Sequence, residues 1–144
     1  MLQARRATPE DLPACAGIVH DWERMTDWLP AGQTPSVAEL TGYLEAAFDA
    51  REIWVIGDPV AGYASLNPET SQLGAIYVAV PGRGHGRHLM NCAKTGRDHL
   101  WLTTHAPNTR AQAFYRREGF VMGDVLPGAP PHSEIALHRM EWWR

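Results

Sequence analysis

The sequence predicts one domain of the α/β class, built on a mixed central sheet of six to seven strands flanked by about four helices. The chain has 144 residues, of which 44% are hydrophobic and 20% charged, and this is the size and composition of a single globular core. Its periodicity follows the order β-α-α-β-β-β-α-β-α-β-β. Tight turns between the early strands predict antiparallel pairing, whereas a strand–helix–strand unit over 73–104 predicts a parallel pair.

The N-terminal part is expected to hold one strand followed by helices. Thr8 and Pro9 indicate a helix start, because Thr can accept a free backbone N–H and Pro fits the first helical position. Ser36 and Glu39 form a capping box, which predicts a second start. The expected elements are a strand over 3–6, a helix from 8 onward, a short helix within 21–35 followed by a loop, and a helix over 36–49.

The C-terminal part is expected to hold the rest of the sheet. Short β-branched or aromatic runs bounded by Gly, Pro and Asn predict its strands, and apolar residues at helical spacing predict its helices. Gly119 is a natural helix C-cap. The expected elements are strands over 53–56, 60–66 and 73–78, a helix from 82–86 to about 98, a strand over 100–104, a helix over 108–118, and strands over 120–125 and 135–142.

Charge and apolar content exclude several classes of protein. The net charge is −3, which argues against a nucleic-acid partner. No apolar run reaches the ~18 residues of a membrane span, and the first eleven residues have no apolar signal core, so we expect a cytoplasmic protein without a membrane partner. Cys15 and Cys92 fit reduced thiols. The stretch from Arg83 to Arg117 carries seven basic residues, which favours a local anion site.

A glycine-rich segment is the most informative part of the chain. Ile76, Tyr77 and Val78 end a strand, and glycines then alternate with Arg83 and His85 before a helix that contains Arg87. Glycine allows a ligand to approach the backbone closely, and a helix N-terminus offers free N–H donors, so Gly82, Gly84 and Gly86 predict an anion cradle, most often for phosphate. The alternative is a tight turn without a ligand. The segment lacks the Lys of an ATP-binding loop and the GxGxxG spacing of a dinucleotide site.

A second motif follows on the next expected helix, and it reads Asn-x-x-Ala-x-x-Phe-Tyr from Asn108 to Tyr115 and continues to Gly119-Phe120. Together with Gly84-His85-Gly86, this motif resembles the GNAT superfamily of acyl-CoA N-acyltransferases, most firmly over 73–121. The resemblance implies the GNAT fold over a single domain, 1–144. Two features depart from the family pattern: Pro81 stands where Gln or Arg is usual, and the connection from strand to loop is about two residues shorter.

The resemblance also implies an activity, the transfer of an acetyl group from acetyl-CoA to an amine. It implies that Tyr115 protonates the departing sulfur and that a backbone N–H near Val78 stabilises the oxyanion. Acetyl-CoA is then expected to contact the strand end, the glycine segment and the second motif. These cofactor-binding residues are Ile76, Tyr77, Val78, Gly82, Arg83, Gly84, His85, Gly86, Arg87, Asn108, Ala111 and Phe114. From the residues alone, Asn108 also fits an N-cap, Phe114 a core residue and Tyr115 a packed aromatic side chain.

The base that accepts the amine proton has several candidates in the sequence, each of which also fits a solvated surface group: Glu23, Asp27, His132 and Glu134. Trp22 and Trp28 fit either the floor of an acceptor pocket or core packing. No metal is expected, because His85 and His88 lack the accompanying ligands of a zinc motif.

Two other functions stay open: an acyl-CoA-binding regulatory module without turnover, and a small interaction domain that binds no CoA. A homodimer also stays open.

Overall fold

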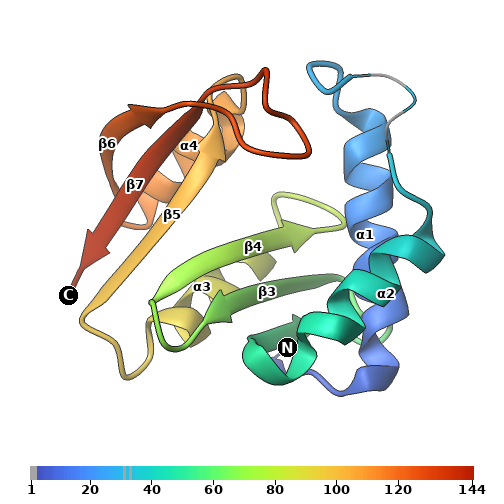
Figure 1. Ribbon diagram of the computed structural model, residues 1–144. Coiled ribbons are helices and arrows are strands. Elements are labelled where there is room, and N and C mark those ends of the chain that lie inside the picture. Colours follow the sequence, from blue (N-terminus) through green and yellow to red (C-terminus); the bar gives the residue numbers. More distant parts are fainter. Residues whose placement is uncertain (1–2, 31, 33) are drawn as a thin grey trace.

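The fold was determined as a computed structural model that describes residues 3–30, 32 and 34–144. Within these residues, seven strands form one sheet in the order β1-β2-β3-β4-β5-β7-β6 (Figure 1). Neighbouring strands are antiparallel except for the parallel pair β4 and β5. The strands are β1 (Ala4–Arg6), β2 (Glu52–Ile56), β3 (Gly62–Asn67), β4 (Gln72–Val78), β5 (His99–His105), β6 (Val121–Leu126) and β7 (Leu137–Trp143). The predicted mixed sheet is confirmed.

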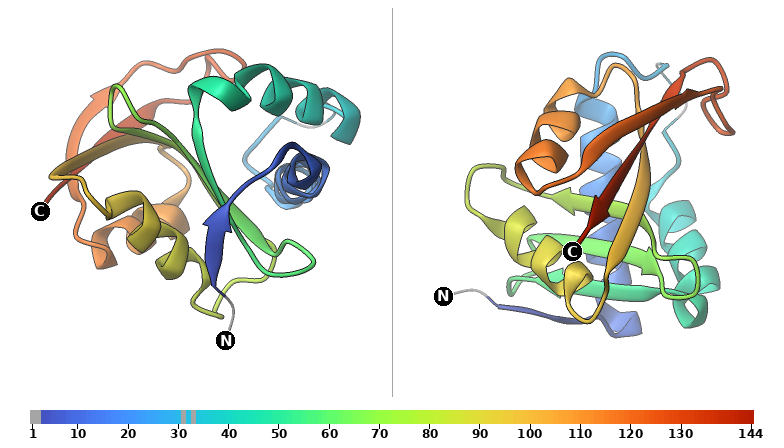
Figure 2. Two further views of the ribbon diagram at one scale, coloured as in Figure 1. Left: turned by 90° about the horizontal axis from the view of Figure 1, so that it is seen from below. Right: turned by 90° about the vertical axis from the view of Figure 1, so that its left-hand side faces the viewer.

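In the described part of the chain, four α-helices cover the two faces of this sheet (Figure 2). They are α1 (Leu12–Met25), α2 (Val37–Ala47), α3 (His85–Lys94) and α4 (Thr109–Arg117). A 3-10 turn precedes α1, and another follows α2. The helices α1 and α2 pack on one face, where Leu12, Cys15 and Tyr63 are buried. The helices α3 and α4 lie on the other face, over the larger core cluster that contains Leu89, Leu102 and Met140.

The structure corrects two expected helices. The described residues of 21–35 form no separate short helix, because α1 continues without a break to Met25. It ends where Thr26 takes an extended conformation and its hydroxyl donates to the carbonyl of Trp22 at 2.6 Å. Residues 31 and 33 of the expected loop lie outside the described part of the chain. The helix expected to run to about 98 ends at Lys94, since Thr95 is extended and Gly96 has a φ of +76°.

Candidate active site

The two parallel strands at the centre of the sheet separate along their length. They pair only at Gln72 and Trp101, near the start of each strand. On its other edge β4 stays paired with β3 as far as Val78, so the edge of β4 that faces β5 lacks a strand partner beyond this point. Figure 1 shows β4 and β5 diverging from that end. Free backbone N–H and C=O groups therefore line a gap in the middle of the sheet, where they can bind a ligand.

The glycine loop, residues 79–84, connects the end of β4 to α3. Gly82 and Gly84 have φ values of +84° and +78°, a conformation that other residues rarely adopt. A Cβ at either position would meet no atom within 4 Å, so the space beside the loop is open. Gly84 is the N-cap of α3, and the first turn of that helix presents backbone N–H groups without partners within the helix. The loop thus has the backbone geometry predicted for an anion cradle.

Near the glycine loop, the two arginine side chains are exposed, whereas His85 and Gly86 are partly buried at the start of α3. Arg83 and Arg87 are exposed, and among the described residues neither forms an ion pair. His85 begins α3, and its buried Nδ1 has no hydrogen-bond partner there. A Cβ on Gly86 would lie 3.2 Å from Cζ of Phe114. Gly86 therefore allows α3 and α4 to pack closely. The sequence pattern alone does not show whether a glycine here makes room for a neighbouring helix or for a ligand.

The end of β4 divides its side chains between the two faces of the sheet. Ile76 and Val78 pack against the core under α3 and α4. Tyr77 lies on the opposite face, where its ring meets Trp22 edge-on at 5.3 Å and stacks on Tyr63 at 5.8 Å. Burial raises the pKa of Tyr77 to about 12. The three residues expected to contact one ligand thus reach different sides of the sheet.

The second motif lies on α4 and directs its aromatic residues toward the core. Asn108 caps the helix, because its side-chain oxygen accepts from the backbone N–H of Ala111 at 3.2 Å. The ring of Tyr115 lies 5.6 Å from that of Phe114 and 5.7 Å from that of Phe120. The Tyr115 hydroxyl donates to no group among the described residues. Burial, and then the nearby Tyr77, raise the pKa of this phenol well above its usual value, so it stays protonated at neutral pH.

A cluster of aromatic and histidine side chains forms on the face of the sheet opposite α3 and α4. It joins the end of α1 and the segment that follows it to the ends of β4 and β5 and to the loop between β6 and β7. The ring centroids of Trp22 and Trp28 are 5.8 Å apart, and those of Trp28 and His105 are 5.3 Å apart. His132 meets His105 at 5.9 Å. We call Trp22, Glu23, Trp28, Tyr77, His105 and His132 the aromatic–histidine cluster.

One carboxylate belongs to this cluster. Oε1 of Glu23 lies 3.9 Å from Nε2 of His132, and the two side chains are 14% and 9% exposed. Burial raises the pKa of Glu23, although His132 and His20 act in the opposite direction. Burial and then His132 lower the pKa of His105. The cluster therefore holds a shielded carboxylate that accepts a proton more readily than an exposed Glu does.

The other two candidate bases have a different environment. Asp27 and Glu134 are exposed, and among the described residues neither forms an ion pair. The sequence analysis did not identify His105 as a site residue. The feature that could have identified it is its position at the end of a strand, three residues before Asn108.

In the described part of the chain no group of three or more His, Cys, Asp or Glu residues could hold a metal ion. No described helix is long and apolar enough to cross a membrane.

Comparison with known proteins agrees with this architecture. Many solved structures match this fold, and three of them serve as examples. These are yncA from Salmonella typhimurium, solved with its cofactor acetyl-CoA (TM-score 0.74, 20% identity, 99% of this chain and 93% of that one), apo YjaB from Escherichia coli (0.79, 21%, 99% and 97%) and ribosomal-protein-alanine N-acetyltransferase from Brucella melitensis (0.75, 24%, 98% and 99%). No curated protein matches in sequence. Residues 21–120, more than half of the chain, match the acetyltransferase (GNAT) family. The chain belongs to this family of N-acetyltransferases.

Proposed function

We propose that this protein transfers the acetyl group of acetyl-CoA to an amine of a small molecule or a protein, by direct attack in a ternary complex. The observation that carries the proposal is the separation of β4 from β5 beyond Gln72 and Trp101, with the open glycine loop at the end of β4. Membership of the acetyltransferase family supports the choice of donor. The donor brings an acetyl group activated as a thioester.

The glycine loop and the start of α3 are proposed to hold the diphosphate of the donor. Open space beside Gly82 and Gly84 allows close approach to the backbone, and the helix N-terminus favours negative charge. Arg83 and Arg87 add positive charge at the rim. The oxygen of the Asn108 side chain already caps α4, so its NH2 group is the one left to donate a hydrogen bond to the pantetheine arm.

Tyr115 is proposed as the general acid. Its hydroxyl is protonated at neutral pH and has no partner among the described residues, so its proton is available to a departing sulfur. A free thiol of the cysteine type has a pKa of about 8.5. Burial disfavours the charged form of both groups, so it raises the pKa of the Tyr115 phenol and also the pKa of a thiol held beside it.

Glu23 is proposed as the general base, with His132 as the residue that positions it. Among the four candidates, these two are brought together in a buried cluster, whereas Asp27 and Glu134 are exposed. A carboxylate whose pKa is raised toward neutrality is a better proton acceptor than an ordinary one. In the reaction a carbon–nitrogen bond replaces the carbon–sulfur bond. One proton passes from the amine to Glu23, and one passes from Tyr115 to the sulfur.

A panel of primary amines tests the proposal. The protein is mixed with acetyl-CoA and each amine, and free thiol release is followed alongside mass spectrometry of the amine. We expect at least one amine to gain an acetyl group with thiol released in equal amount, above the rate measured without amine. Acetyl-CoA that binds by calorimetry without turnover on any amine would favour the regulatory module. Absence of binding would favour the interaction domain.

A further inference from the structure

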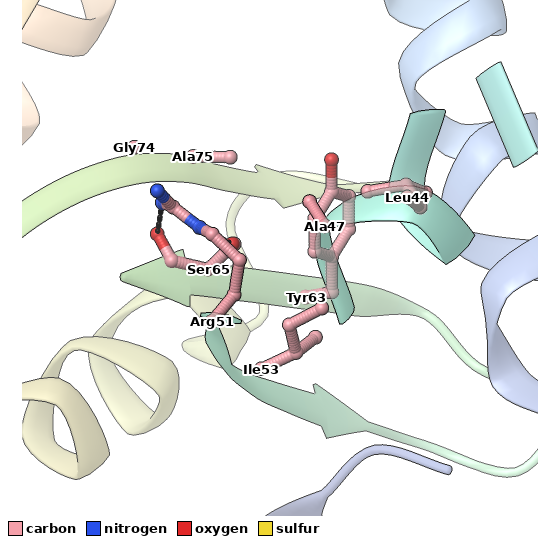
Figure 3. A pocket seen from close by; sticks show the side chains of 8 residues that line it. All are labelled: Leu44, Ala47, Arg51, Ile53, Tyr63, Ser65, Gly74 and Ala75. Carbon is pink, nitrogen blue, oxygen red and sulfur yellow. Dashed lines mark hydrogen bonds between the residues drawn. The ribbon is translucent and has the colours of Figure 1, made fainter. Parts of the chain in front are cut away.

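A cavity of about 310 Å³ lies on the face of the sheet that α1 and α2 cover, away from the glycine loop (Figure 3). It is bounded by the C-terminal half of α2 and by strands β2, β3 and β4. Its walls are largely apolar, with Leu44 and Ala47 contributed by α2 and Ile53 and Ala75 by the sheet. A cavity of this kind accommodates the hydrocarbon part of a small ligand.

Arg51 is the only charged side chain among the described residues that line the cavity. Its side chain crosses β3 toward β4, as Figure 3 shows. Nε donates to the hydroxyl of Ser65 at 2.8 Å, and Nη2 donates to the Ser65 carbonyl oxygen at 3.2 Å. These two bonds occupy one edge of the guanidinium. The Nη1–Nη2 edge has no partner among the described residues, and none of their carboxylates forms an ion pair with Arg51.

Gly74 makes room for this guanidinium. A Cβ built on Gly74 would collide with Nη2 of Arg51. The φ of Gly74 lies outside the range that favours glycine. Glycine is therefore needed here because it has no side chain, and not because of its backbone freedom. Tyr63 completes the polar part of the cavity, and its hydroxyl has no partner among the described residues. The sequence therefore leaves a half-buried cation with free donors beside an apolar space.

A half-buried guanidinium without a counter-ion is partly desolvated, and no negative charge offsets that cost. Burial lowers the pKa of Arg51, which means that the surroundings disfavour its charge. A planar carboxylate can accept two parallel hydrogen bonds from a guanidinium edge, and charge-assisted bonds of this kind are the strong ones. A doubly charged phosphate matches a single arginine less well, because the remaining wall is apolar and offers few donors.

We propose that this cavity binds a small monocarboxylate, with the carboxylate on the free edge of Arg51 and an apolar body against Leu44, Ala47 and Ile53. The site is separate from the proposed acetyl-CoA contacts at the glycine loop. Tyr63 lines the cavity and stacks on Tyr77, which lies at the end of β4.

The first test titrates the ¹⁵N-labelled protein with hexanoate, followed by the backbone amide signals. Hexanamide, which has the same body and no charge, is the matched ligand, and inorganic phosphate is the third arm. We expect hexanoate to shift the amides of Ser65 and Gly74 saturably, with at least tenfold tighter binding than hexanamide. Equal binding of hexanamide, tighter binding of phosphate, or no saturable shift at these two residues would overturn the proposal.

Two variants complete the test. Arg51→Gln removes the cation, and Gly74→Ala displaces the guanidinium without removing it, so both should weaken hexanoate binding at least tenfold. Arg24→Gln is the control, because it removes one exposed positive charge at the end of α1. Unchanged affinity in a folded Arg51→Gln variant contradicts the proposal. If that variant does not fold, Gly74→Ala decides: unchanged affinity there contradicts the proposal equally.

Discussion

The two sides of the gap between β4 and β5 are built in different ways. On the side of α3, the glycine loop is one continuous segment, exposed, and its useful groups are backbone N–H donors. On the other side, the aromatic–histidine cluster draws Trp22, Glu23, Tyr77, His105 and His132 from separate segments and shields them from solvent. The first side can bind an anion through its backbone, whereas the second depends on the identity and packing of side chains.

This difference predicts how each side responds to change. A backbone cradle tolerates most substitutions except those that place atoms in its open space. A buried cluster of titratable side chains depends strongly on single polar atoms, because charges interact more strongly away from water. The predictions below use this contrast.

The largest effect is expected for Tyr115→Phe, which removes the hydroxyl and keeps the ring that packs on Phe114 and Phe120. If Tyr115 is the general acid, kcat should fall by roughly 10²–10⁴-fold. Acetyl-CoA affinity should change little, because binding in the ground state does not use the proton. Steady-state kinetics and calorimetry measure both. A variant with nearly normal kcat would assign Tyr115 to packing alone.

A similar loss is expected for Glu23→Gln, which keeps the shape of the side chain and removes the proton acceptor. In the wild type, kcat/KM should fall on the acidic side of neutrality as Glu23 takes up a proton, at a pH above the usual pKa of Glu, because burial raises the pKa of Glu23. That acidic limb should disappear in Glu23→Gln. Asp27→Asn is the matched control, since Asp27 is exposed nearby. Equal pH profiles for Glu23→Gln and the wild type would contradict the assignment.

An intermediate effect is expected for Gly84→Ala on the other side of the gap. Gly84 and Gly96 have nearly the same φ, +78° and +76°, and neither would place a Cβ within 4 Å of another atom. Both alanine variants should therefore lose about 1–2 kcal/mol of stability from the left-handed backbone. Only Gly84→Ala should weaken acetyl-CoA binding, by at least tenfold. Calorimetric affinities that are equal in the two variants would remove the loop from the binding site.

The smallest effect is expected for Gly86→Ala, measured by chemical unfolding. Its Cβ would lie 3.2–3.3 Å from the Phe114 ring, and overpacking of this kind costs about 1–3 kcal/mol. The higher helix propensity of alanine offsets up to about 1 kcal/mol of this cost, so the free energy of unfolding should fall by about 1 kcal/mol. The loss should shrink in a Phe114→Leu background, which removes the crowding ring. An equal loss in both backgrounds would show that Phe114 is not its cause.

Most of the fold could be predicted from local patterns. The capping box at Ser36 and the Asn108 cap both form as expected, because each depends on residues only three positions apart. The segment after α1 could not be predicted equally well. Nothing in the sequence before Pro30 required the helix to break at 21, and its end at Thr26 depends on a side-chain bond to Trp22.

The candidate site was predictable on one side only. The glycine loop is contiguous, so its spacing alone indicated its backbone geometry. The contact between Glu23 and His132 joins residues more than a hundred positions apart, and sequence reasoning could name both residues but could not choose them over Asp27 and Glu134. Tyr77 illustrates the same limit, because its expected position beside Ile76 and Val78 did not reveal that it faces the aromatic–histidine cluster.

The most direct measurement of the central proposal is a titration of the ¹⁵N-labelled protein with acetyl-CoA, followed by its backbone amide signals. The proposal predicts saturable shifts concentrated in 76–78, in 82–87 and in 108–115, with Gly84 among the largest. Ser65 and Gly74, in the cavity beside Arg51, should move little. Saturable binding that shifts Ser65 and Gly74 and leaves 82–87 unchanged would contradict the assignment of the glycine loop as the acetyl-CoA site.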